Sequence, residues 1–222
     1  MLFARLALNL PVKTFLEMKI IVAESTQVYN KTDENALNIM EACPRIWFKA
    51  DSALLTNGKP MFVPDFTGEM SASPYLALRI CRMGKSIPAR FAYRYYDAAC
   101  VAVDFTAEDV LRQLSAKGEP WDMAKSFDGS VCVGQFTPTD VRPLTGKQIV
   151  SLVINGKEMS TIMIDDVALL AGEVIERVSR FFTLRQGDLL LIGKPDHKPV
   201  VEIDSHIEGR LNDDVLTEFN VK

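Results

Sequence analysis

The sequence predicts one α+β domain instead of a regular alternation of strands and helices. Its 222 residues are 48% hydrophobic, which provides enough chain for one large core. Strand-like segments outnumber helical ones, and several predicted strands separate the helices from one another. No repeat, low-complexity tract or linker divides the chain. We therefore expect a single domain over residues 18–222.

The first seventeen residues differ in character from the rest. Their apolar run is interrupted repeatedly, at Arg5, Asn9, Pro11 and Lys13. The segment therefore lacks the continuous apolar stretch of a signal peptide, and it is too short and polar to cross a membrane. Met18 then opens the run MKIIVA, which is typical of a buried strand. Residues 1–17 are interpreted as an extension that is disordered or not native.

The first half of the domain shows one further helix signal and several strand signals. Thr32 or Asp33 can cap a helix whose apolar residues recur at helical spacing up to Cys43. A turn is predicted at residues 57–58, from the Asn-Gly pair. Strand-like or extended segments are predicted at residues 45–50, 60–64, 76–82 (half buried) and 91–103.

The second half carries the clearest local signals. Residues 106–109 resemble a capping box that starts a helix, which Gly118 and Pro120 close. A strand at 149–154 leads into Asn155-Gly156, the strongest hairpin signal in the chain. Residues 165–182 form the clearest helix pattern, capped by Asp165 or Asp166, and a buried strand follows at 189–192.

Asp104 is the residue whose local setting most suggests chemistry. It closes the apolar run that begins at Val101, and a helix start follows at once. A carboxylate at a strand end beside a helix start is a plausible place for a metal ion or a substrate. The alternative is that Asp104 is a helix-start or turn aspartate with a purely structural role.

The composition excludes several classes of partner. The formal net charge is −4 and no basic run stands out, so neither nucleic acid nor a membrane surface is expected as a partner. The cysteines are scattered without a C-x-x-C pair, which predicts reduced thiols and a cytoplasmic protein: Cys43, Cys81, Cys100 and Cys132. The two histidines, His197 and His206, lie in a polar region and are expected at the surface.

Several motifs, taken in order, resemble the fumarylacetoacetate hydrolase family, particularly its small bacterial members. Residues 101–109 (VAVDFTAED) are similar to the family pattern V-A-N-D-V-(T/S)-A-R-D, and residues 125–128 match K-S-F-D. Residues 48–64 resemble the family's segment of similar form. Further similar pieces are the V-N-G hairpin at 153–156, T-L-x-P-G-D at 183–188 and T-G-T-P at 192–195.

This resemblance implies an α+β fold built on a mixed β-roll with a few peripheral helices, usually assembled as a homodimer. Family members bind Mg²⁺, Ca²⁺ or Mn²⁺ and act on small oxo-acids. Their reactions are hydrolysis of carbon–carbon bonds, decarboxylation, and isomerisation of acids such as 2-hydroxyhepta-2,4-diene-1,7-dioate. The metal acts as a Lewis acid that stabilises the developing enolate.

The chain departs from the family where the metal would be held. The family uses an E-x-E pair on a strand, whose two glutamates point to one face, together with the aspartate that Asp104 matches. Ser73 and Tyr75 stand at the two glutamate positions. Serine and neutral tyrosine offer oxygen but no negative charge, whereas Mg²⁺ favours anionic oxygen ligands. Glu69 is a possible replacement ligand.

Other family positions are altered too. Asn30 and Asp33 stand in the segment where the family places its water-activating residues, and an amide cannot act as a general base. Lys125 keeps the K-S-F-D lysine, which in the family lies beside metal and substrate. It is therefore the candidate catalytic residue, although a structural salt bridge is an equal alternative. Lys194 is a possible contact for an anion.

Three hypotheses follow for the function. In the favoured one, the chain keeps the family fold but has lost its metal ligands, and it is catalytically impaired or non-catalytic while still able to bind a small anion. In the alternative, it is an active hydrolase or isomerase of an oxo-acid with an altered metal site. In the third, it is an unrelated α+β binding domain.

Overall fold

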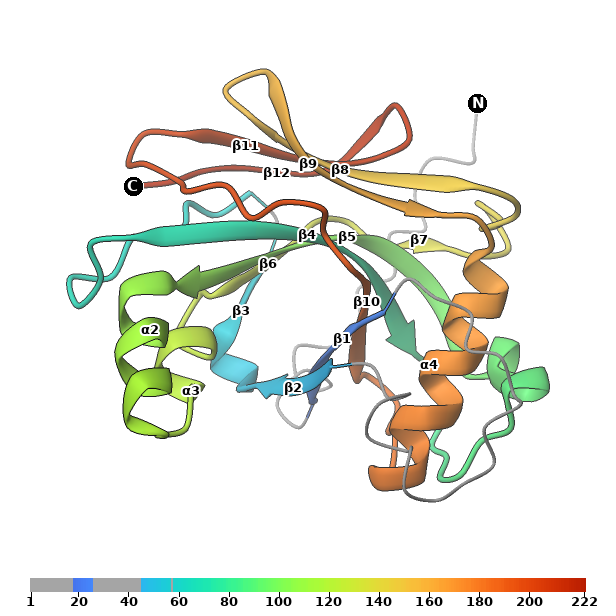
Figure 1. Ribbon diagram of the computed structural model, residues 1–222. Helices are drawn as coiled ribbons and strands as arrows, with labels where there is room; N and C mark the ends of the chain where they lie inside the picture. The colour runs from blue at the N-terminus through green and yellow to red at the C-terminus, as the bar shows by residue number, and fades with distance from the viewer. Residues whose placement is uncertain (1–17, 26–44, 57) are drawn as a thin grey trace.

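The computed structural model describes residues 18–25, 45–56 and 58–222, and it shows two β-sheets stacked in layers (Figure 1). The larger sheet contains β1 (Ile20–Glu24), β2 (Arg45–Lys49), β3 (Leu54–Thr56), β4 (Met70–Ile80), β5 (Tyr96–Ala107), β6 (Val131–Val133), β7 (Thr137–Pro138) and β10 (Leu189–Gly193). The smaller sheet contains β8 (Gln148–Ile154), β9 (Lys157–Ile164), β11 (His206–Leu211) and β12 (Asp214–Asn220). The prediction of a mixed β-roll in an α+β domain is confirmed.

The larger sheet mixes parallel and antiparallel pairs. Its order is β2-β1-β10-β4-β5-β6-β3, and β7 pairs with β5. The pairs β1–β10 and β3–β6 are parallel, whereas β4 and β5 form a long antiparallel pair at the centre. The sheet curls into an open half-barrel, and the smaller sheet lies across its outer side (Figure 1). The inner side of the half-barrel is therefore the concave face.

Alternation along β4 and β5 divides the core between the two faces of the larger sheet. Ala72, Val103 and Phe105 pack against residues of the smaller sheet, such as Leu152 and Ile207. The two sheets approach so closely that a Cβ at Gly134 would lie 1.7 Å from the carbonyl oxygen of Leu216. The side chains that alternate with these along each strand, including Tyr75, point to the concave face and belong to a second hydrophobic cluster there.

The helices lie at the edges of the half-barrel (Figure 1). They are α2 (Glu108–Lys117), α3 (Asp122–Lys125) and α4 (Val167–Phe181), with short 3₁₀ helices η3 (Asp51–Ala53) and η4 (Ala89–Arg94). α4 begins where Asp166 accepts a hydrogen bond from the backbone N–H of Leu169, at 3.0 Å. Its apolar face, which includes Val174, Ile175 and Val178, belongs to the same cluster as β1 and β10.

The strongest local signals in the sequence are confirmed. The predicted helix over 165–182 corresponds to α4, and Asp166 is its cap. Asn155 and Gly156 connect β8 to β9 with φ angles of +52° and +78°, as the two-residue hairpin turn requires. The predicted strands at 18–23, 45–50 and 189–192 correspond to β1, β2 and β10.

Three predicted boundaries are wrong. The strand expected at 76–82 begins at Met70 and is almost wholly buried, since the sheets and helices cover both of its faces. The strand expected at 91–103 runs from Tyr96 to Ala107, after the 3₁₀ helix η4. Thr106 does not cap α2; it is the penultimate residue of β5, and α2 starts after Ala107 without a side-chain cap.

Several predictions concern residues outside the described ranges. These are the extension at 1–17, the helix at 32–43 and residue 57 of the predicted turn. Within the described ranges, no helix combines the length and apolar character needed to cross a membrane. Cys81, Cys100 and Cys132 are free thiols, and burial raises the pKa of each of them.

Candidate functional site

The two central strands bring the candidate residues together on the concave face. In the β4–β5 pair, Ser73 lies directly opposite Asp104 and Ser71 lies opposite Thr106. Tyr75 follows Ser73 on the same face of β4. Asp104 is thus an interior strand residue, and the interpretation of it as a helix-start or turn aspartate is wrong.

Asp104 is paired with a lysine that the sequence analysis did not select. The Nζ atom of Lys49, at the end of β2, lies 2.5 Å from Oδ1 of Asp104. The lysine side chain is 0% exposed and the aspartate side chain 2%. The contact is a buried ion pair. One carboxylate oxygen is therefore already engaged.

Lys49 contacts four oxygen atoms in addition to that of Asp104. Its ammonium donates to the hydroxyl and the carbonyl of Ser130, both at 3.0 Å, and to the carbonyls of Phe105, at 3.4 Å, and Lys125. Burial lowers the pKa of Lys49 and raises that of Asp104, while their mutual attraction opposes both shifts. These contacts enclose the Lys49 ammonium completely, so it is not accessible to a ligand.

A second carboxylate lies on the other side of Tyr75. The Tyr75 hydroxyl donates to Oε1 of Glu24 at 2.7 Å, and the ammonium of Lys198 reaches the same oxygen at 3.0 Å. Burial raises the pKa of Glu24, but Lys198, Tyr75 and Arg45 outweigh it, so the net pKa is lowered. Burial, Asp104 and Glu24 all raise the pKa of Tyr75 well above its ordinary value. The phenol is therefore a neutral hydrogen-bond donor.

Lys125 lies beside the Lys49 centre but has a different environment. Its ammonium stands 4.5 Å from the centroid of the Trp47 ring and donates one long hydrogen bond, of 3.4 Å, to the hydroxyl of Thr106. Burial lowers its pKa; Asp104 opposes this, and the nearby cations Lys198 and Lys49 add to it. The predicted structural salt bridge from Lys125 to a carboxylate is not among the ion pairs of the described residues.

The remaining predicted residues are not part of this group. Glu69 is exposed and pairs with Arg112 at 2.6 Å. Its backbone carbonyl meets the N–H of Glu108, four residues along the ladder from Asp104, or about 13 Å at about 3.3 Å per residue. Lys194 is exposed after β10, and the cation that reaches the site from that segment is Lys198. Asn30 and Asp33 lie outside the described residues.

Glu24, Lys49 and Lys198 were missed by the sequence analysis. Each stands at or beyond the end of a strand, where local pattern gives a charged residue no more weight than a solvated end. Lys49 had one signal: it is a lysine inside the segment at 48–64 that resembles the family. Only the curling of the larger sheet brings the three together with Asp104 and Tyr75.

The residues present do not fit a divalent metal of the kind that family members bind. Of Ser73, Tyr75 and Asp104, only Asp104 has a carboxylate, and Lys49 already neutralises it. Ser73 carries no charge, and the neutral Tyr75 hydroxyl donates a hydrogen bond to Glu24. Among the described residues, no three histidine, cysteine, aspartate or glutamate side chains gather as a metal-binding group. Mg²⁺ prefers near-octahedral anionic oxygen ligands, which this arrangement does not supply.

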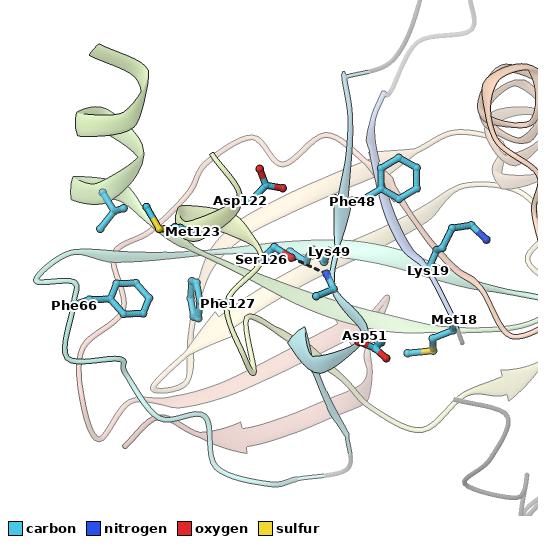
Figure 2. A pocket seen from close by; sticks show the side chains of 12 residues that line it. Met18, Lys19, Phe48, Lys49, Asp51, Phe66, Asp122, Met123, Ser126 and Phe127 are labelled. Carbon is cyan, nitrogen blue, oxygen red and sulfur yellow. Dashed lines mark hydrogen bonds between the residues drawn. The ribbon is translucent and has the colours of Figure 1, made fainter. Parts of the chain in front are cut away.

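Two cavities adjoin the site. The larger, of about 970 Å³, is lined mainly by apolar side chains, and Figure 2 shows Phe66 and Phe127 edge to face within it. Ser126 also lines this cavity and accepts a hydrogen bond from the backbone N–H of Ala50, at 2.6 Å. The smaller, of about 300 Å³, has the lining Ile46, Trp47, Phe48, Pro120, Trp121, Asp122 and Lys125.

Comparison with known families gives the assignment. Residues 22–215 match the model of the fumarylacetoacetate (FAA) hydrolase C-terminal family. This chain belongs to that family. The third hypothesis, an unrelated domain, is thereby excluded.

Relatives and solved structures agree with the assignment. The mitochondrial oxaloacetate tautomerase fahd-1 of Caenorhabditis elegans is 29% identical over 192 residues, which cover 85% of this chain and 90% of the relative. The fumarylpyruvate hydrolase of Pseudomonas aeruginosa, solved with Mn²⁺ and pyruvate, superposes with a TM-score of 0.76 at 22% identity, covering 92% of this chain and 88% of that one. The 2-hydroxyhepta-2,4-diene-1,7-dioate isomerase of Mycobacterium marinum superposes with a TM-score of 0.72 at 25% identity, covering 93% and 75%.

Proposed function

We propose that this chain is a family member that has lost metal-dependent catalysis and binds a small oxo-acid at Lys125. The observation that carries the proposal is the buried contact of 2.5 Å between Lys49 and Asp104. A divalent ion at Asp104 would have to sit beside an ammonium group, with a serine and a phenol as its neighbours. Repulsion between the two cations opposes such binding, because charges interact strongly where water is excluded.

The charges around the site favour an anionic ligand. Lys49, Lys125, Lys198 and Arg45 outnumber Asp104, Glu24 and the Asp122 carboxylate of the cavity lining, and Lys125 lines that cavity of about 300 Å³. That volume is at the lower end of small-molecule sites. The relatives supply the class: one is named for oxaloacetate, and a solved neighbour contains pyruvate. A small oxo-acid held by Lys125 is therefore the ligand we propose.

An altered metal site is the second candidate, and one observation favours it. Glu24 and Asp104 both act electrostatically on Tyr75, so two carboxylates lie near one phenol. If an ion displaced Lys198 from Glu24, these two carboxylates could share it. The family's hydrolase or isomerase activity would then persist with a different ligand set.

Calorimetric titration with Mn²⁺ separates the two candidates. The first predicts no saturable binding to the wild type at millimolar Mn²⁺, and oxaloacetate turnover, after subtraction of the protein-free rate in the same buffer, that is the same with EDTA as with Mg²⁺. The second predicts micromolar binding that Asp104→Asn and Glu24→Gln both abolish. Asparagine keeps the shape of Asp104 and leaves Lys49 an oxygen partner, so loss of binding in a folded Asp104→Asn variant would be specific. Such a result would overturn the loss of metal dependence.

We further propose that the chain works as a cytoplasmic homodimer. Three cysteines of the described residues are free thiols, which supports the compartment, and the family resemblance implies the dimer. Light scattering of the purified full chain measures its mass directly, and a monomeric mass at micromolar concentration would contradict the dimer.

A further inference from the structure

Lys125 is a buried amine at the wall of a small aromatic cavity. The residue is 7% exposed, and it lines the cavity together with Trp47, Phe48 and Trp121. Burial in this wall disfavours an ammonium ion, so a larger share of the amine is neutral than in water, although the Trp47 ring and the Asp122 carboxylate of the same lining act in the other direction. A neutral amine is a nucleophile toward carbonyl groups.

The hydrogen bonds of Lys125 leave its nitrogen available. Nζ makes one hydrogen bond among the described residues, of 3.4 Å, to Thr106. Lys49, by contrast, contacts five oxygen atoms and is fully enclosed. The two lysines are neighbours, since the backbone carbonyl of Lys125 accepts from Lys49. The positive charge of Lys49 therefore adds to the cost of protonating Lys125.

A second unused polar group belongs to a residue of the cavity wall. Trp47 is 8% exposed, and its indole Nε1 is itself covered and has no hydrogen-bond partner within the described ranges, so a ligand reaches it only after the indole turns. The Lys125 nitrogen lies 4.5 Å from the centroid of that ring. A buried N–H without an acceptor costs free energy, which a ligand oxygen would recover. A 2-oxo acid carries a carboxylate next to its carbonyl, so once the indole turns its N–H toward the cavity the acid has one group for each residue.

We propose that Lys125 forms a reversible imine with the carbonyl group of a 2-oxo acid, whose carboxylate is held by the indole N–H of Trp47. The inference rests on the proposed function, because it uses the same ligand class. In this proposal a protonated imine takes the place of the metal ion that acts as a Lewis acid in the metal-dependent relatives.

The reaction balances without any further reagent. The Lys125 nitrogen attacks the carbonyl carbon, a C–N bond forms, and the carbonyl electron pair moves to oxygen. Proton transfers then release that oxygen as water and leave a protonated imine. The imine withdraws electrons from the adjacent carbon, so a proton on that carbon becomes acidic and exchanges with water. Addition of water to the imine reverses the sequence and restores the amine.

Reductive trapping with pyruvate tests the imine directly. The full chain is incubated with pyruvate, cyanoborohydride and EDTA, and the modified lysine is located by peptide mass spectrometry. We expect one adduct per chain, at Lys125, formed at least about tenfold faster than at any other lysine. Lysine modification spread evenly over the surface, with Lys125 no faster than the rest, would refute the proposal.

Variants make the test specific. Lys125→Arg keeps a cation but removes the nucleophile, so the fast adduct should vanish, whereas Lys157→Arg, in an exposed hairpin, should leave it unchanged. Trp47→Phe should raise the half-saturating pyruvate concentration severalfold while the adduct stays on Lys125. An adduct that persists at the same rate in a folded Lys125→Arg chain would overturn the assignment.

Deuterium exchange provides a second readout on the unmodified wild type. In D₂O with EDTA, the methyl protons of pyruvate should exchange faster with the protein than without it, as proton NMR measures. Exchange at the background rate, together with even lysine labelling, would refute the imine. Neither result depends on Mn²⁺ affinity, so failure of the imine and failure of the proposed loss of metal binding are distinguishable.

Discussion

Lys49 and Lys125 are buried lysines in adjoining regions of one site, yet their environments differ in kind. Lys49 is fully enclosed, contacts Asp104 at 2.5 Å and meets four further oxygen atoms. Lys125 has one long hydrogen bond, stands over an aromatic ring and faces a cavity. Burial alone therefore does not define the role of a lysine. A closed set of acceptors makes the first one structural, and an incomplete set leaves the second available for a ligand.

Lys49→Met should have the largest effect on stability. The substitution leaves Asp104 as a buried charge without a partner, which costs about 3–5 kcal/mol of unfolding free energy. Urea denaturation at neutral pH measures the loss. The double variant Lys49→Met/Asp104→Asn should recover a large part of it, because the uncompensated charge is gone. A single variant as stable as the wild type would break the distinction between the two lysines.

Tyr75→Phe should have an intermediate effect, because it removes the hydrogen bond to the carboxylate of Glu24. We expect a loss of about 1–2 kcal/mol at neutral pH. The pKa of Glu24 is lowered from 4.5 in the folded chain, so its interactions stabilise the protein above that pH and fade as the pH falls through the lowered value. Urea midpoints should therefore differ less between the variant and the wild type in acid than at neutral pH. An equal difference at both values would contradict the assigned partner.

Lys125→Met should change stability little while abolishing ligand chemistry. The ammonium has few partners to lose, and a methionine of similar shape suits an apolar cavity wall, so unfolding free energy should stay within about 1 kcal/mol of the wild type. Urea denaturation run beside Lys49→Met makes the comparison. Equal losses in the two variants would show that both lysines are structural.

Glu69→Gln should have the smallest effect. Both partners of the Glu69–Arg112 pair are exposed, with 40% and 60% of their side-chain surfaces accessible, so solvent screens the interaction. The urea midpoint and the response to Mn²⁺ should both match those of the wild type. A change in Mn²⁺ response would restore Glu69 as a metal ligand.

The sequence predicted the fold better than the site. Local signals were enough for α4, for the hairpin at Asn155-Gly156 and for the position of β10, because turn chemistry and helical spacing act over short distances. The pairing of Ser73 with Asp104 is consistent with the motif positions, since the resemblance places both residues at metal-ligand positions of the family. The boundaries of β4 and β5 were wrong because long-range burial extends strands beyond their local pattern.

The site itself needed contacts that sequence pattern does not encode. Lys49 reaches Asp104 from a strand 55 positions earlier in the sequence numbering, and Glu24 reaches Tyr75 across an intervening strand. The sequence analysis selected Lys125 and not Lys49, because Lys125 lies in the recognisable K-S-F-D motif. A polar partner that depends on sheet curvature becomes visible only once the strand order is known.

The oxygen atoms around Lys49 come from segments that are far apart along the chain. Its ammonium donates to carbonyls 56 to 81 residues away, at Phe105, Lys125 and Ser130. The full set of contacts requires β2, β5 and the segment from the end of α3 to have docked, so we expect it to be completed late in folding. Trp47 lies two residues away with its indole buried, so its fluorescence should change in that final phase. Stopped-flow refolding followed by tryptophan fluorescence would then time the completion of the native state.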